Sequence, residues 1–333
     1  MSTPRTSIIM PVYNTGNRVV ASIESVLAQT DTDFELLVMI DASPDDASAR
    51  IADFLAAHPD ERVRVFDNPV NKGVSAVRNQ GLDNMRGQWV AFLDSDDAFA
   101  PDFLATMHAA AGADSGAENI DVVACAHTLI DAGGKNRERR RGEPGVYSGD
   151  EALTTLLKDK FTPYVWDKIF RASLFKNLRF PEDIHRAEDQ VVVAGAYAQA
   201  RSVKLIKDAL YNYTVDAGGL TWGKITPVAE SRALMAHMKD AAGAVVQTAE
   251  GKRAYDVSWV LTFLNTAQQA LVAGTEEGNR VIKQCRREIS WAQILNVFRA
   301  PSVVFGAAAV LLKVSPVLYK KLYGAYIKKM YGI

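Results

Sequence analysis

The 333-residue sequence has the composition of an ordinary globular protein, with 48% hydrophobic and 23% charged residues and a formal net charge of −1. This length suits one large domain, or one domain with an extension, and the near-neutral balance excludes binding of polyanions through overall charge. The two cysteines, Cys125 and Cys285, exclude a disulfide framework and a cysteine-built metal site, as expected for a reducing cytoplasm.

The N-terminal third of the chain alternates between strand and helix patterns. Strands are predicted at 7–12, 34–40, 63–66 and 90–93, and helices at 14–29, 47–57, 73–85 and 98–110. Such alternation is typical of a parallel, right-handed α/β sheet. Neither GxGxxG nor a P-loop sequence follows any of these strands, which argues against a dinucleotide or P-loop phosphate site. No apolar signal region precedes the first strand, so we expect a cytoplasmic protein.

The fourth strand ends in an acidic run, Asp94-Ser95-Asp96-Asp97. In open α/β sheets ligands bind beyond the carboxyl ends of the strands, so these side chains are expected to face a ligand crevice. Carboxylates suit hard cations, and Mg2+ is usually held by one or two of them together with substrate phosphates. The run therefore predicts a metal-bound nucleotide. The alternative is that the acids cap the helix predicted at 98–110. We assign this role to Asp97, for which support of the metal ligand is the other possibility.

Four blocks in chain order, residues 7–14, 22–30, 71–82 and 92–97, resemble glycosyltransferase family 2, and the resemblance extends over residues 5–222. It implies the GT-A fold, which is a Rossmann-like α/β fold with a mostly parallel central sheet. It also implies a nucleotide-sugar donor, a divalent cation (Mg2+ or Mn2+) and inversion at the anomeric carbon. We accordingly expect a catalytic domain at 1–224, with a nucleotide-binding half at 1–115 and an acceptor half at 116–224, and a helical extension at 225–333.

On the donor side, the resemblance implies roles for residues that follow the strands. The implied donor-binding residues are Pro11, Tyr13, Asn14, Asp41, Arg78, Asp94 and Ser95, and the implied metal ligand is Asp96. Asp41 matches an acid that accepts a hydrogen bond from the pyrimidine ring of the nucleotide. The sequence departs from the family pattern beside it, because Ile40 and Ala42 replace an acid and a glycine. A Lewis-acid cation at Asp96 would stabilise the charge on a departing nucleoside diphosphate.

An inverting transfer also requires a base that takes the proton of the acceptor hydroxyl. Residues 179–191 contain two Glu-Asp pairs, and the family places its pair immediately before an apolar helix. Glu188-Asp189 meets that condition, because the apolar run 191–197 follows it directly. The resemblance thus implies Asp189 as the base, with Glu188 as its neighbour or substitute. The alternative is a pair of acids that complements the dipole of a first helical turn.

Candidate acceptor residues come from the second half of the catalytic region. Residues 162–171 resemble a segment of bacterial polysaccharide and lipopolysaccharide members of the family, in which Trp166 forms an aromatic platform for the acceptor sugar or lies in the core. Lys168 is expected to reach a phosphate or an acid, or to lie on the surface. Gly219 and Thr221 belong to a loop that closes over the diphosphate or forms an ordinary turn. The arginine-bearing loop 131–145 is either disordered or faces the acceptor.

The C-terminal part of the chain has helical patterns only, at 228–248, 252–272 and 276–294. Residues 289–333 contain no acid and carry lysine and arginine among apolar side chains. The longest uncharged run, 300–312, is too short to span a bilayer, which needs about 20 apolar residues. A basic amphipathic segment is therefore expected at the surface of an anionic membrane leaflet. Packing on the catalytic domain and an oligomer interface are the alternatives.

These features predict an inverting, metal-dependent glycosyltransferase at the inner face of the cell membrane. It would move a sugar from a nucleotide sugar, for which we expect a UDP-sugar, to a hydroxyl of a lipid-linked or polymeric glycan in cell-surface polysaccharide biosynthesis. No nucleic-acid partner is expected, and an oligomer is compatible with the sequence. Two alternatives stay open: a catalytically inactive module of the same fold that binds a nucleotide sugar or a glycan, and a nucleotidyltransferase, which also uses acids and Mg2+ on an α/β sheet.

Overall fold

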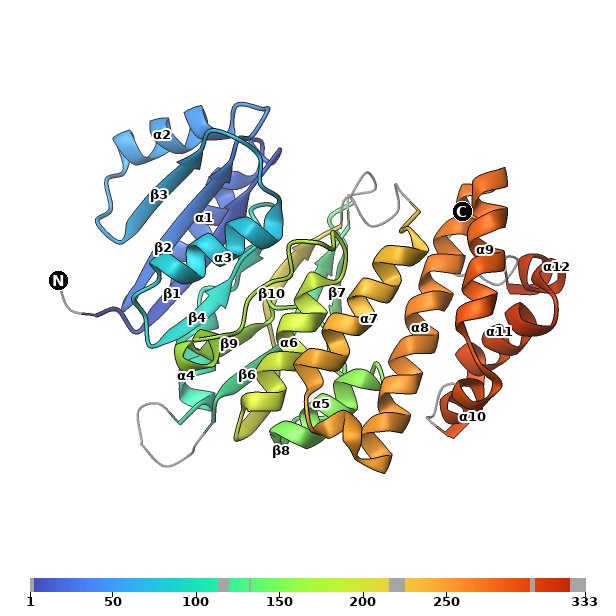
Figure 1. Ribbon diagram of the computed structural model, residues 1–333. Coiled ribbons are helices and arrows are strands. Elements are labelled where there is room, and N and C mark those ends of the chain that lie inside the picture. Colours follow the sequence, from blue (N-terminus) through green and yellow to red (C-terminus); the bar gives the residue numbers. More distant parts are fainter. Residues whose placement is uncertain (1–2, 113–119, 132, 216–224, 300–302, 324–333) are drawn as a thin grey trace. The chain divides into compact units, whose positions relative to one another are not determined.

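The computed structural model describes residues 3–112, 120–131, 133–215, 225–299 and 303–323 (Figure 1). The chain divides into two compact units. The first unit comprises residues 1–152 and 162–216, and the second unit comprises residues 153–161 and 217–333. The division near residue 216 falls shortly before the boundary expected at 224, and the sequence did not predict that 153–161 joins the second unit.

The first unit contains one sheet, whose described part has ten strands (Figure 1). They are β1 (Thr6–Val12), β2 (Phe34–Asp41), β3 (Val63–Asn68), β4 (Trp89–Phe92), β5 (Ala98–Phe99), β6 (Val122–Ile130), β7 (Asn136–Arg139), β8 (Gly145–Ser148), β9 (Lys168–Arg171) and β10 (Ser202–Thr214). The order is β3-β2-β1-β4-β9-β6-β10-β5, with β7 beside β6 and β8 beside β10. Along this path only β9 and β5 run against the other six strands. The expected mostly parallel sheet of a mixed α/β fold is confirmed.

Helices cover the sheet of the first unit on both faces. They are α1 (Val19–Leu27), α2 (Ala47–Ala57), α3 (Val74–Asn84), α4 (Phe103–Ala110), α5 (Gly149–Leu157), which continues into the second unit, α6 (Glu188–Gln199) and the short 3-10 helix Ala172–Phe175. Side chains of α1, α2 and α4 pack against Ile8 and Met10 of β1. On the opposite face, Gly81 of α3 lies so close to Ile9 that an added Cβ would be 2.5 Å from its side chain. A glycine is therefore required where α3 crosses β1.

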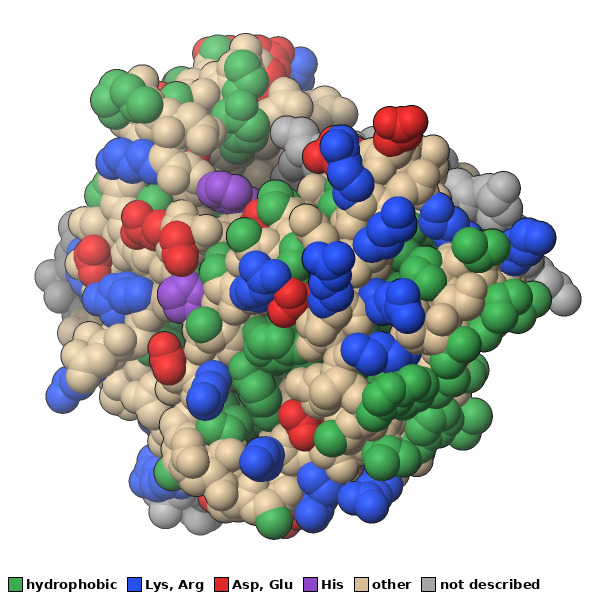
Figure 2. Space-filling view, turned by 45° about the vertical axis from the view of Figure 1, so that its right-hand side comes forward, with side chains coloured by type: hydrophobic (Ala, Val, Ile, Leu, Met, Phe, Trp, Pro, Cys, Tyr) green, Lys and Arg blue, Asp and Glu red, His purple; other side chains and the backbone are tan. Residues whose placement is uncertain are grey.

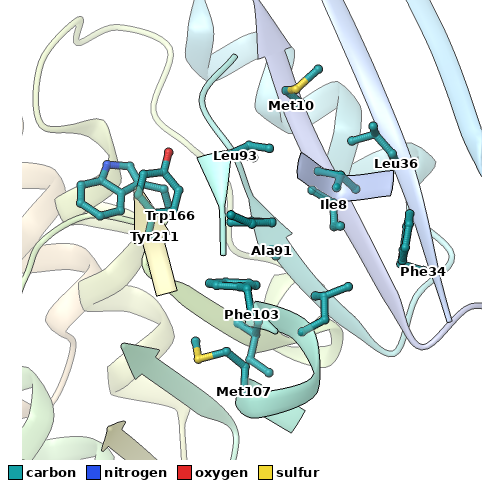
Figure 3. Packing of buried hydrophobic residues seen from close by; sticks show 14 of the residues in the cluster. Ile8, Met10, Phe34, Leu36, Ala91, Leu93, Phe103, Met107, Trp166 and Tyr211 are labelled. Carbon is teal, nitrogen blue, oxygen red and sulfur yellow. The ribbon is translucent and has the colours of Figure 1, made fainter. Parts of the chain in front are cut away.

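The core explains why the first strands form where the sequence predicts them. All eight residues of β2 and six of the seven in β1 are buried, as expected for parallel strands that are covered on both faces. Figure 3 shows Ile8 and Met10 of β1, Leu36 of β2 and Phe103 of α4 among the buried side chains of one apolar cluster. This packed layer holds the ends of the strands in place, and those ends carry the candidate site.

Two predictions in the first unit were wrong. The segment 131–145, expected as a loop, contains the strand β7, which pairs with β6. Residues 98–110 do not form a single helix, because Ala98–Phe99 is the strand β5, which pairs with β10, and α4 begins only at Phe103. Pro101 disfavours helical backbone at the preceding residue, and the backbone N–H of Ala100 instead donates to the carbonyl of Leu210 at 2.8 Å. Asp97 consequently does not cap a helix.

The second unit is helical in its described residues. It contains α7 (Val228–Ala242), the 3-10 turn Val245–Gln247, α8 (Ala249–Ala273), α9 (Glu276–Glu288), α10 (Trp291–Arg299), α11 (Val303–Val314), α12 (Pro316–Leu318) and the π-turn Tyr319–Tyr323. The helix expected at 276–294 is two helices. Ser290 and Gln293 explain the break: each accepts a hydrogen bond from the backbone N–H of the other, which is a capping box that starts α10. Within the described ranges, no helix has both the length and the apolar character needed to cross a membrane.

Candidate active site

Polar segments leave three neighbouring strands of the first unit at one edge of the sheet. β2, β1 and β4 are adjacent and parallel, so the segments that follow them, residues 42–46, 13–16 and 94–97, begin side by side. Pro11 lies within β1 itself, one residue before its end. The sheet thus brings together segments that are distant in the chain, as the 2.7 Å contact between the hydroxyls of Thr15 and Ser95, 80 positions apart, shows.

The loop after β1 is bonded to the loop after β2. The backbone N–H of Asn14, which has a φ of 56°, donates to the hydroxyl of Ser43 at 2.8 Å. The N–H of Gly16 and the hydroxyl of Ser43 donate to the two carboxylate oxygens of Asp45 at 2.7 and 2.5 Å. Burial raises the pKa of Asp45, but these hydrogen bonds outweigh it and hold the pKa below its usual range. The side chain of Tyr13 is left exposed beside this bonded pair of loops.

Asp41, at the end of β2, is buried and shapes the loop that precedes α3. Its two carboxylate oxygens accept hydrogen bonds from the backbone N–H groups of Lys72 at 2.8 Å and Gly73 at 2.9 Å. Gly73 has a φ of 87°, a conformation that favours glycine. A carboxylate has about four acceptor positions, so Asp41 keeps acceptor capacity for a ligand while it holds this loop.

The backbone of the acidic run 94–97 is held in place by a serine of α1. The hydroxyl of Ser22 lies within hydrogen-bond distance of the backbone carbonyls of Ser95, at 3.0 Å, and Asp97, at 2.6 Å. The backbone N–H of Asp97 also donates to the carbonyl of Asp94 at 3.0 Å, which closes a turn. The run is therefore a rigid turn and not a loose loop end.

Asp97 joins this turn to β10. One oxygen of its buried carboxylate accepts from the hydroxyl of Tyr211 and the other from the backbone N–H of Thr214, both at 2.7 Å. Burial, followed by the nearby charges of Asp94 and Asp96, raises the pKa of Asp97 to about 8. Asp97 is thus a buried acid that fixes the acidic run against β10, and this role replaces the helix cap that the sequence predicted.

Arg78, on α3, links the acidic run to α6. Its guanidinium donates to Glu188 at 2.8 Å and to Asp94 at 2.9 Å, and it lies 5.3 Å from the centre of the Phe180 ring. The side chain is only 5% exposed. Its Nε finds no acceptor within the described residues. Although burial disfavours the charge, the acids Asp94, Asp189 and Glu188 raise the pKa of Arg78, so the cation persists.

Asp189 lies in the first turn of α6 next to Glu188. The residue before them, Ala187, has a φ of 58°, a left-handed conformation that turns the chain into the helix. Burial and the neighbouring carboxylate of Glu188 raise the pKa of Asp189 from 3.8 to about 7, against the opposing effect of Arg78. Glu188 is engaged by Arg78. Asp189 is therefore the acid whose affinity for a proton suits a base near neutral pH.

Asp96 is the acid of the run that is most open to a ligand. Its side chain is 33% exposed, and Arg18 lies 3.7 Å from one of its oxygens. Among the described residues, no three His, Cys, Asp or Glu side chains are grouped to hold a metal ion. One partly exposed carboxylate nevertheless fits Mg2+ or Mn2+ when substrate phosphates complete the coordination. The donor set fits a cation that arrives with a nucleotide.

The candidate acceptor residues lie in different surroundings. Trp166 is 4% exposed and belongs to the apolar core cluster, where it stacks on Tyr211 with the ring centres 4.3 Å apart (Figure 3). Trp166 therefore lies in the core, which was one of the two alternatives. Gly219 and Thr221 lie outside the described residues.

Lys168 is fully buried and its ammonium has four partners. It donates to the carbonyls of Thr162 and Tyr164 at 3.1 and 2.7 Å, to the hydroxyl of Thr162 at 3.0 Å and to the carboxylate of Asp167 at 2.5 Å. A buried charge requires such pairing. Lys168 therefore holds the segment 162–164 from inside the protein. The structure agrees with the expectation that Lys168 reaches an acid, Asp167, and excludes the surface position.

Several residues that build the site had no role in the sequence predictions. They are Thr15, Ser22, Tyr211 and Thr214, each of which bonds to the acidic run. One signal was available, because Ser22 is a polar residue on the apolar face of α1, and a buried hydroxyl needs a partner. The partners of Tyr211 and Thr214 lie more than 110 positions away, and no local pattern identifies them.

Comparison with known proteins supports this description. The family model described as Glycosyl transferase family 2 matches residues 7–179. The succinoglycan biosynthesis protein ExoO of Rhizobium meliloti (strain 1021) is 30% identical over 223 residues, which cover 66% of this chain and 63% of that protein. The chain spans 62–63% of the length of the curated relatives considered.

Solved structures have a similar fold. S. aureus TarS 1–349 in complex with UDP-GlcNAc has a TM-score of 0.68 at 19% identity, over 98% of this chain and 92% of that chain. The mannosyltransferase PcManGT from Pyrobaculum calidifontis, in complex with GDP-Man and Mn2+, has a TM-score of 0.55 at 15% identity, over 100% of this chain and 88% of that chain. At such identities the likeness concerns the fold.

Proposed function

The chain belongs to glycosyltransferase family 2, and from this premise we propose that it is an inverting, metal-dependent glycosyltransferase. It transfers a sugar from a nucleotide sugar, with UDP as the nucleotide, to a hydroxyl of a lipid-linked or polymeric glycan in cell-surface polysaccharide biosynthesis. The observation that carries the proposal is the cluster around Arg78, which joins the acidic run after β4 to the Glu188-Asp189 pair of α6. The name of the relative ExoO supports the assignment to polysaccharide biosynthesis.

Asp189 acts as the base in this proposal. Its carboxylate takes the proton from the acceptor hydroxyl as that oxygen forms a bond to the anomeric carbon, and the bond from that carbon to the nucleoside diphosphate breaks. The raised pKa of Asp189 suits this step, because a base works best with a pKa near the working pH. Arg78 bonds to Glu188 and Asp94 and lowers the pKa of Asp189, which helps Asp189 to ionise and lose its proton between turnovers.

The donor is held at the strand edge. Tyr13, Asn14 and Asp41 lie near the nucleoside, and Asp94 and Ser95 near the ribose and diphosphate. Asp96 would hold Mg2+ or Mn2+, which supplies Lewis-acid stabilisation of the leaving diphosphate. The complexes of structural neighbours with UDP-GlcNAc and with GDP-Man and Mn2+ support a nucleotide-sugar donor and a cation.

The C-terminal helices supply a membrane-binding face in this proposal. Large apolar side chains are exposed on α10, α11 and α12, namely those of Trp291, Leu295, Phe298, Val303, Val304, Val314, Val317 and Leu318. Figure 2 shows hydrophobic side chains gathered along the margin of the molecular surface, with lysine and arginine side chains beside them. Residues 289–333 contain no acid. Apolar side chains bordered by positive charge suit the surface of an anionic bilayer.

A turnover assay with matched variants tests the catalytic proposal. Release of UDP from a panel of UDP-sugars is measured with Mn2+ and with membrane extracts as the acceptor source. Asp189→Asn is expected to lower the rate by roughly 10²–10⁴-fold while it retains donor binding, seen as a thermal shift. Asp183→Asn, in the other Glu-Asp pair, is the matched control and is expected to keep the rate. Equal rates in the two variants would remove Asp189 from the mechanism, and donor binding without any turnover by the wild type would favour an inactive binding module.

A vesicle experiment tests the membrane proposal. The protein is floated with vesicles of neutral lipid alone and with vesicles that contain 30 mol% anionic lipid, an amount of about one lipid in three chosen to give a strong surface potential. Binding to the anionic vesicles only, and less of it in a Lys320→Glu/Lys321→Glu variant, is the expected result. Equal binding to neutral and anionic vesicles would contradict the electrostatic part of the proposal.

A further inference from the structure

Three neighbouring strands of the first unit place two arginines on the same face of the sheet as two tyrosines. Across β7, β6 and β10, Arg139 is the register partner of His127, and His127 that of Tyr211. One row further along, Arg137 pairs with Leu129, which pairs with Tyr213. Register partners point to the same face of a sheet, and the two residues of each strand are two positions apart, so both rows share one face.

The tyrosines support a stack of aromatic rings that rises to the surface. Trp166 lies on Tyr211 and on Tyr213, with ring centres 4.3 and 5.6 Å apart and interplanar angles of 23° and 24°. Tyr164 covers Trp166 at 4.6 Å and 9°. Exposure rises through the aromatic stack, from 0% at Tyr211 through 4% at Trp166 to 39% at Tyr164. The outermost ring is therefore presented to solvent by a rigid aromatic base.

Lys168 explains how Tyr164 is presented. Its buried ammonium binds the carbonyl oxygens on both sides of Pro163, those of Thr162 and Tyr164. This fixes the backbone so that Tyr164 and Trp166 fall on the same side and stack. Burying a charged ammonium costs free energy, and here it holds an exposed tyrosine in one orientation. A buried charge that serves to orient an exposed tyrosine points to a binding role for that tyrosine.

The aromatic stack is joined to the proposed donor site. Tyr211 is the innermost ring of the stack, and its hydroxyl donates a hydrogen bond to the carboxylate of Asp97 in the acidic run at 2.7 Å. Thr214, at the end of the same strand, donates its N–H to the other oxygen of that carboxylate. The rings of Trp166 and Tyr211 therefore connect a ligand on Tyr164 to the segment assigned to the donor diphosphate.

The arginines of β7 differ from most arginines of the first unit. Arg62, Arg64, Arg86 and Arg201 each pair with an acid at 2.7–2.9 Å. Arg137 and Arg139 are exposed and form no ion pair within the described part of the chain. Two like charges two positions apart on one face repel each other. Their placement does not stabilise the strand, and it is suited to an anion brought by a ligand.

We propose that Tyr164, Arg137 and Arg139 form a subsite for an acceptor glycan that carries negative charge. A sugar ring lies on the exposed face of Tyr164, and a phosphate or carboxylate group of the glycan is bound by the guanidinium groups of Arg137 and Arg139. The inference rests on the proposed function, because it names the class of acceptor for that site. Arginine suits both anions, since its planar fork donates two parallel hydrogen bonds to either.

The test measures binding of three small probes that share one ring. The probes are methyl glucoside, methyl glucoside 6-phosphate and methyl glucuronoside, titrated by saturation-transfer NMR at low salt. Wild-type protein is expected to bind one or both charged probes at least tenfold more tightly than the neutral probe, and added salt is expected to reduce the difference. Preference for the phosphate or for the carboxylate identifies which anion the acceptor carries.

Variants show whether the named residues are responsible. Arg137→Ala/Arg139→Ala is expected to weaken binding of the charged probe roughly tenfold without affecting the neutral probe. Tyr164→Ala is expected to weaken binding of all three. Arg140→Ala is the matched control. Arg140 comes directly after Arg139, the last residue of β7, so it is an odd number of positions from both Arg137 and Arg139 and does not continue their row. It also has its own partner, Glu143, at 3.6 Å.

Two outcomes overturn the inference: equal affinity for charged and neutral probes, or an effect of Arg140→Ala as large as that of the double variant. Binding of UDP, the part shared by all UDP-sugars, to the wild type is measured in the same samples. If it fails, the proposed function fails. If it is present while the probes show no charge preference, only the subsite is wrong.

Discussion

Two buried clusters of charge lie at opposite ends of the same strands, and they differ in which charge is in excess. At the amino ends of the strands, one acid, Glu35, is surrounded by donors. It accepts from the hydroxyl of Ser7 at 2.6 Å, from Arg64 at 2.9 Å and from the backbone and side chain of Arg86 at 2.7 and 2.9 Å. Burial raises the pKa of Glu35, but these hydrogen bonds outweigh it and lower the pKa overall.

At the carboxyl ends the ratio is reversed, because one cation serves three acids. Arg78 bonds to Asp94 and Glu188, and the charge of Asp189 is close enough to raise the pKa of Arg78 as well. Burial, together with the carboxylates of Glu188 and Asp94, raises the pKa of Asp189 to about 7, because the single guanidinium of Arg78 does not offset these effects. The comparison teaches that the saturated acid serves stability alone, whereas the undersupplied cluster keeps one acid ready to exchange a proton.

The largest expected effect comes from removing the cation of the undersupplied cluster. Arg78→Ala leaves three buried or partly buried acids without a counter-charge, and we expect a loss of about 3–5 kcal/mol in the free energy of unfolding at pH 8. The loss should shrink at pH 5, because Asp189, with a pKa of about 7, is then protonated. Urea unfolding at both pH values measures this loss. Arg78→Lys is the control and should recover part of the stability. An alanine variant as stable as the wild type would show that Arg78 does not compensate the charges of the three acids.

The next effect comes from the saturated cluster. Glu35→Gln leaves two arginines without their acid, and we expect a loss of about 2–3 kcal/mol with the KM for the donor unchanged. In the wild type the folded pKa of Glu35 lies below 4.5, so its contribution is complete above that pH and is lost as the pH falls through the folded value. Thermal unfolding from pH 3 to 7 measures this. A changed KM would show that the two ends are not independent.

A third effect has the opposite sign with pH. Asp189 has a folded pKa of about 7 and an ordinary value of 3.8, so the folded state binds more protons between these limits and stability falls as the pH rises through them. Asp189→Asn should remove most of this slope and be more stable than the wild type at pH 8 by about 2 kcal/mol. This is less than the full pKa difference implies, because the pKa of Asp189 depends on the neighbouring charge of Glu188. Asp97, with a pKa of about 8, keeps a residual slope of the same sign. A wild type that gains stability from pH 5 to 8 would contradict this reading.

The smallest effect concerns the backbone before the pair Glu188-Asp189. Ala187 has a φ of 58°, where a Cβ is unfavourable and glycine is not. Ala187→Gly should stabilise the fold by up to about 1 kcal/mol, since the relief of strain is partly offset by the entropy of the unfolded chain. Denaturant unfolding is the measurement. Ala57→Gly, at the end of α2, is the control and should destabilise.

The comparison also shows what a local pattern can predict. The helix Ala47–Ala57 begins and ends where its apolar spacing predicts, and the strands β1 and β2 follow from continuous apolar runs. The failures were at 98–110, where pairing with β10 and Pro101 overrode helical propensity, and at 276–294, where a readable capping box at Ser290 was missed. Local signals therefore predict elements well until a distant strand competes for the same backbone.

By itself the sequence determined the order of strands and helices, the family, and the acids that stand where strands end, since each of these depends on neighbours in the chain. Only the tertiary structure decided what those acids do. The bond of Arg78 to Glu188 spans 110 positions, and that of Asp97 to Tyr211 spans 114, so the charge balance around Asp189 exists only once the sheet is assembled. The pKa of a buried group depends on every charge and dipole around it, and those surroundings are a property of the fold.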